Sequence, residues 1–139
     1  MTGLQLIALA VVGLIGLAFG LRIARRRRIA LAVYWARACT GRDWRRAFPG
    51  ATKSEIRCFL RMFVSAFALP AANTLKFLPT DRVLSIYHAS SPPDGGIDVL
   101  ELETLAKRLS DEYQFDLRSL WRDDLALGDL FASLHRAAT

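Results

Sequence analysis

The sequence predicts an all-α protein, in which an N-terminal transmembrane helix precedes a small helical bundle. Gly3–Leu21 contains no charged residue, and ~19 helical residues at ~1.5 Å each span ~29 Å, the thickness of a bilayer's hydrocarbon core. Beyond it, apolar residues recur at helical spacing, without strand-like alternation. We divide the 139 residues into a transmembrane anchor (1–22), a basic juxtamembrane helix and linker (23–50) and a helical domain (51–139).

The charge pattern predicts the orientation of the anchor. The net charge is +6, and a cluster of arginines follows the apolar run directly: Arg22, Arg25, Arg26, Arg27 and Arg28. Because positive flanks stay in the cytoplasm, we expect the N-terminus outside and the later residues inside. These arginines are candidates for contacts with lipid headgroups, so residues 3–28 are expected to meet lipid. A cleaved signal peptide is the alternative, but no basic residue precedes the run. Nucleic acid is not expected as a partner next to a membrane span.

Two further features belong to the N-terminal helix. Gly16 and Gly20 have the GxxxG spacing that lets two membrane helices approach closely, which makes them candidate homodimer contacts. The alternative is that both glycines face lipid. After the arginines no helix breaker occurs before Cys39, and Tyr34 and Trp35 are residue types that favour the headgroup region.

The remaining chain contains clear helix signals. Thr52 and Glu55 form a capping box that predicts a helix from Lys53, ended by Pro70. Its exposed side is expected to carry a basic stripe within residues 53–61: Lys53, Arg57 and Arg61. A loop is expected at 71–76, then a short helix near 81–87, a helix from Asp98 to Tyr113 and a final helix from Leu127 to Arg136. Cys39 and Cys58 fall within apolar helical patterns, so we expect reduced, buried thiols.

Four segments of the C-terminal half resemble acyl carrier proteins, and more closely the small acyl-carrier-like domains of bacterial proteins: Pro79–Tyr87, Asp98–Glu101, Leu109–Leu117 and Leu127–Phe131. The resemblance implies a carrier-shaped helical domain. In carriers a serine between Asp and Leu holds phosphopantetheine, whereas Val99 occupies that position here. Valine has no hydroxyl group, so no cofactor is expected.

The resemblance also implies a protein-binding surface on the predicted helix from Asp98 to Tyr113. The acidic residues of that helix are candidate partner contacts: Asp98, Glu101, Glu103, Asp111 and Glu112. The alternative is an ordinary solvated helix face.

The sequence contains no motif for catalysis or metal binding. His88 and His135 are the only histidines, and no motif pairs either with a nucleophile. We therefore predict a non-enzymatic, membrane-anchored protein-binding module on the cytoplasmic side of a bacterial inner membrane. One alternative is a functional acyl or phosphopantetheine carrier, or an accessory protein of lipid metabolism. Another is a small immunity or regulatory membrane protein.

Overall fold

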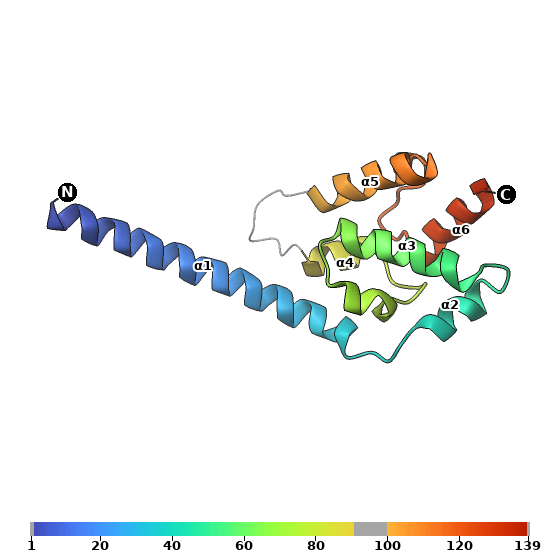
Figure 1. The fold of residues 1–139 in the computed structure, drawn as a ribbon, viewed down its shortest axis with the longest axis horizontal. Coiled ribbons are helices and arrows are strands. Elements are labelled where there is room, and N and C mark those ends of the chain that lie inside the picture. Colours follow the sequence, from blue (N-terminus) through green and yellow to red (C-terminus); the bar gives the residue numbers. More distant parts are fainter. Residues whose placement is uncertain (1, 91–99, 139) are drawn as a thin grey trace.

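The computed structural model describes residues 2–90 and 100–138, and this part of the chain is helical without strands. The prediction of an all-α protein is therefore confirmed. Figure 1 shows one long helix that projects from a bundle of shorter ones. The elements are α1 (Gly3–Trp35), α2 (Gly41–Ala47), α3 (Lys53–Ala66), the 3₁₀ helix η1 (Ala71–Lys76), α4 (Val83–Ser90), α5 (Leu100–Tyr113), the 3₁₀ turn η3 (Leu117–Ser119) and α6 (Leu127–Ala138).

Helix α1 is continuous through the apolar run and the arginine cluster. Its 33 residues extend ~50 Å, which exceeds the ~30 Å hydrocarbon core of a bilayer. An 18-residue window has a mean hydropathy of 2.4, and none of that window is buried. By length and composition α1 could therefore cross a membrane.

The last turns of α1 belong to the core of the bundle. Leu31 is only 4% exposed. The rings of Tyr34 and Trp35 lie 5.4 and 5.7 Å from the ring of Phe77, between centroids. Burial raises the pKa of Tyr34, with the Asp81 carboxylate adding to this effect and Arg37 opposing it. Both aromatic residues thus pack on Phe77.

Two arginines attach α1 to the bundle. Arg27 lies within α1, and Arg37 lies just after its end. The Arg27 side chain donates to the carbonyl oxygens of Phe67 and Ala68 at 3.4 and 3.2 Å. These carbonyls follow the end of α3, where helical partners run out and a cation is favourable. Arg37 forms a bidentate pair with Asp81, at 2.5 and 3.0 Å. The hydrogen bond to Asp81 is the main cause that raises the pKa of Arg37.

Helix α3 forms the centre of the bundle. The predicted capping box is confirmed, because the Thr52 hydroxyl accepts from the Glu55 N–H at 3.1 Å and the Glu55 carboxylate accepts from the Thr52 N–H at 2.9 Å. The inner face of α3 is apolar and buried, as its spacing predicted: Ile56, Phe59, Leu60, Met62, Phe63, Val64 and Ala66.

Two expectations about individual segments are wrong. Cys39 and Cys58 are both exposed, since Cys58 lies outside the buried face of α3 and Cys39 lies between α1 and α2. Residues 71–76 form the 3₁₀ helix η1 instead of a loop. Leu75 of this helix packs against the core, and Thr74 is buried. The sequence pattern did not indicate this packing.

Trp44 extends the core into the segment predicted as a linker. This α2 side chain is fully buried, and its indole N–H donates to the carbonyl oxygen of Phe77 at 2.8 Å. Its ring centroid lies 5.8–6.1 Å from those of Phe48, Phe59 and Phe131. Residues before the predicted domain boundary at 51 therefore supply packing to the helices after it.

Truncation tests how far the folded unit extends. Deleting residues 2–21 should leave a water-soluble fragment that still unfolds cooperatively, because nothing in that run is buried. Deleting residues 2–50 removes Leu31 and Trp44, and a buried side chain of this size contributes ~2–5 kcal/mol. Because the whole free energy of unfolding of a domain is only ~5–15 kcal/mol, this second fragment should be largely unfolded. Urea titrations followed by circular dichroism would measure both, and equal midpoints would contradict the shared core.

Trp44→Phe tests the hydrogen bond to Phe77 together with the packing of the indole ring. We expect the free energy of unfolding to fall by ~1–3 kcal/mol, since the variant removes a buried donor and leaves a gap. Trp121→Phe is the matched control, because Trp121 is only partly buried against the core. If Trp121→Phe lowered the free energy of unfolding as much as Trp44→Phe, the buried, hydrogen-bonded position of Trp44 would not account for its effect.

Candidate functional site

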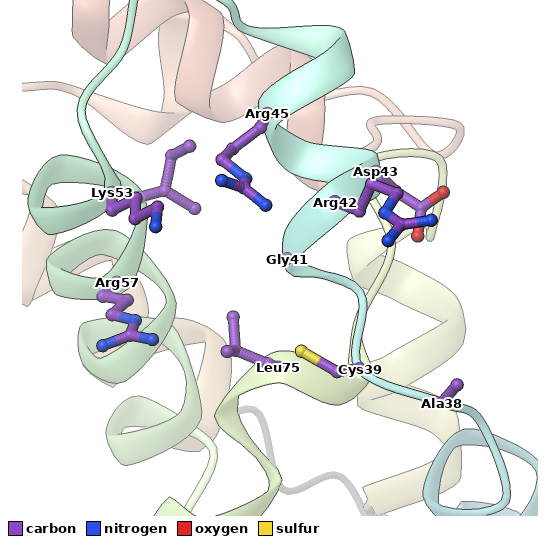
Figure 2. Close-up of a pocket in the computed structure, with 10 residues that line it drawn as sticks. Ala38, Cys39, Gly41, Arg42, Asp43, Arg45, Lys53, Arg57 and Leu75 are labelled. Atoms are coloured by element: carbon purple, nitrogen blue, oxygen red, sulfur yellow. The ribbon is translucent and has the colours of Figure 1, made fainter.

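A groove of about 530 Å³ separates α2 from the start of α3. Figure 2 shows that Arg45 of α2 and Lys53 of α3 come from opposite walls, with Arg57 one turn farther along α3. Leu75 and Cys39 lie at its floor in the same view. The complete lining is Ala38, Cys39, Gly41, Arg42, Asp43, Arg45, Lys53, Ile56, Arg57 and Leu75.

Hydrogen bonds before α2 hold the walls in place. The Thr40 N–H donates to the carbonyl of Leu75 at 2.9 Å. The Thr40 hydroxyl lies 3.0 Å from the same carbonyl and 2.8 Å from that of Phe77. The chain entering α2 is therefore attached to η1, and η1 packs on α3. This attachment sets the width of the groove.

The groove carries an uncompensated positive charge. Its lining contains four cationic side chains against the single carboxylate of Asp43. The four cations are exposed, and within residues 2–90 and 100–138 none of them forms an ion pair: Arg42, Arg45, Lys53 and Arg57. Unpaired cations on facing walls favour an anionic ligand.

Part of this groove follows from the predicted basic stripe. Lys53 and Arg57 line it, whereas Arg61 lies one turn farther along α3 and lines a different hollow. Sequence reasoning placed Arg42 and Arg45 in a linker and did not predict that they line a groove with Lys53 and Arg57. The available signal was the cluster of arginines around Trp44, a residue type that seldom stays in a solvated linker.

The structure spreads the candidate acidic residues around α5. Asp98 and Val99 lie outside the described residues. At 100° per residue, Glu101 and Glu112 project within ~20° of each other, while Glu103 and Asp111 project elsewhere. One carboxylate oxygen of Glu101 is buried without a hydrogen-bond partner in the described part of the chain. The four described acids therefore lie on more than one side of α5.

The candidate lipid contacts divide into two groups. Arg27 is half-buried and bonded to the end of α3. The other members of the cluster are exposed along α1: Arg22, Arg25, Arg26 and Arg28. Gly16 and Gly20 face open space, because a Cβ added to either would meet no atom within 4 Å.

An apolar pocket with a volume of about 290 Å³ lies among α3, α5 and α6. Its walls are mainly apolar, and the His135 imidazole lies 4.0 Å from the Glu55 carboxylate at its rim. Burial raises the pKa of Tyr113, with smaller contributions from Glu112 and Cys58. The lining is Thr52, Ser54, Glu55, Cys58, Tyr113, Phe131, Leu134, His135 and Ala138.

Neither potential metal ligands nor comparisons with known proteins assign a function to a site. In the described ranges, no three His, Cys, Asp or Glu side chains gather as a metal site would require. No protein-family model, curated protein or solved structure matches the chain. The resemblance to acyl carrier proteins therefore stays a prediction, and the groove between α2 and α3 is the site with the most definite chemistry.

Proposed function

We propose that this chain is a membrane-anchored, non-enzymatic binding module of a bacterial inner membrane, with its helical domain in the cytoplasm. The groove between α2 and α3 binds an acidic segment of a partner protein. The observation that carries this proposal is the set of four exposed cations that form no ion pair in the described structure. Complementary charge accelerates encounter and selects partners, which suits a recognition surface.

The position of the groove favours a partner from the aqueous phase over lipid. Arg27, beside the membrane segment, contacts the chain just after the end of α3, whereas the groove lies at the first turns of α3. The 14 residues of α3 extend ~21 Å. Figure 1 also places α2 and the N-terminus at opposite ends of the molecule. The surface potential of a membrane decays within ~8 Å at physiological salt, so headgroups act weakly at the groove.

The continuous helix α1 gives the module a defined height above the bilayer. Because its last turns are packed into the domain, no flexible linker separates the anchor from the groove. Anchoring raises the effective concentration of the groove for partners at the membrane. The exposed arginines of α1 then meet anionic headgroups at about 1 kcal/mol each.

The two native cysteines allow the orientation to be tested directly. A membrane-impermeant maleimide applied to spheroplasts should modify the exposed Cys39 and Cys58 only after the membrane is permeabilised. The control is Thr2→Cys in a background without both native cysteines, and this variant should be modified in intact spheroplasts. The reverse pattern would place the domain outside and contradict the proposal.

Charge removal tests the groove. The full chain in lipid nanodiscs should bind a fluorescent oligo-aspartate peptide, and Arg45→Gln with Arg57→Gln should weaken binding about tenfold. Two exposed charge contacts at ~0.7 kcal/mol each account for this factor. The matched control is Arg46→Gln with Arg61→Gln, which removes the same charge from the same helices outside the groove. Equal losses in both double variants would indicate diffuse attraction and no site.

A further inference from the structure

The basic groove between α2 and α3 and the apolar pocket among α3, α5 and α6 lie on either side of the start of α3. Lys53 and Arg57 project into the basic groove, and their sequence neighbours Ser54 and Cys58 line the smaller, apolar pocket. The exposed ridge between them is therefore formed by a single helix, α3. A segment of chain that crosses this ridge would lie over both hollows at once.

The pocket has the size and lining of a site for one side chain. At about 290 Å³ it lies at the lower limit for whole small-molecule sites. Phe131 and Leu134 form its buried wall, and the partly buried ring of Tyr113 borders it. Pockets of this kind hold the aromatic and aliphatic anchors that dominate binding energy at protein interfaces.

We propose that the acidic segment held in the groove also places one large apolar side chain in this pocket. This inference rests on the proposed function, because the groove supplies the charge that brings the segment to α3. Crossing a helix of ~10–12 Å diameter takes about three to four extended residues. The partner motif is therefore a run of acidic residues with one aromatic or branched aliphatic residue three to four positions away.

Charge and anchor have separate roles in this arrangement. The exposed cations of the groove favour acidic chains over neutral or basic ones, but they do not distinguish one acidic chain from another. The pocket accepts one apolar side chain at a fixed distance from the charges, so it selects among acidic segments. Burying such a side chain is expected to tighten binding about tenfold or more.

Each hollow contains one native thiol, so both contacts can be followed in the same molecule. Cys39 lines the groove and Cys58 lines the pocket, and both are exposed. The full chain in nanodiscs would be incubated with either of two peptides, an oligo-aspartate carrying one tryptophan three residues away and the same peptide with alanine there. Maleimide modification of each cysteine is then timed by mass spectrometry.

We expect the two cysteines to be protected from maleimide by different sets of peptides. Both peptides should slow modification of Cys39, but only the tryptophan peptide should slow modification of Cys58. The tryptophan peptide should also bind about tenfold more tightly. Cys58→Phe, which fills the pocket, should abolish this tenfold gain. Ser65→Phe is the matched control two turns farther along the exposed side of α3, outside the pocket, and should retain the gain.

The possible failures are distinguishable. If both peptides protect Cys39, yet bind equally well and leave Cys58 unprotected, the anchor pocket is overturned and the groove stands. If neither peptide protects Cys39, the proposed function and this inference are both overturned. If Cys58→Phe retains the tenfold gain while its thermal unfolding matches the parent chain, the tryptophan binds elsewhere and the pocket assignment is overturned.

Discussion

Phe77 is the residue on which the rest of the structure depends. Its side chain is fully buried, and its carbonyl oxygen accepts from the Thr40 hydroxyl and the Trp44 indole, each at 2.8 Å. Its ring contacts aromatic rings of α1 and α3: Tyr34, Trp35 and Phe63. One residue after η1 therefore joins three helices through both its backbone and its side chain. The attachment of α1 and the wall of the groove share this support.

Local signals in the sequence were sufficient for the individual helices. The capping box at Thr52 and Glu55 set the start of α3, and the uncharged run at the N-terminus set the apolar character of α1. The same signals could not assign Trp44 to the core. Helix α2 has only seven residues, too few for an apolar period to be recognised, and its burial depends on partners in α3 and α6. The predicted burial of Cys39 and Cys58 was wrong for a similar reason, because a broad apolar arc does not show which of its residues are buried.

The groove was only half predictable for a related reason. Lys53 and Arg57 are one turn apart on one helix, so their spacing alone places them together. Arg42 and Arg45 face them because Thr40 bonds to carbonyls 35 and 37 residues later, and no local pattern specifies such long-range contacts. The acids of α5 differ in this respect. Their number suggested a binding surface, and helical rotation places them on more than one side of α5, so their role in binding stays a prediction.

The unbroken course of α1 has a consequence for pairing between two copies. Gly16 and Arg27 are eleven residues apart, as are Gly20 and Leu31, and eleven residues return to within ~20° of the same side of a helix. The glycine face therefore continues directly into the face that holds the domain. If two copies associated through these glycines, each domain would project toward the other helix. Pairing within the bilayer and collision or contact between the two domains would then be a single, inseparable event.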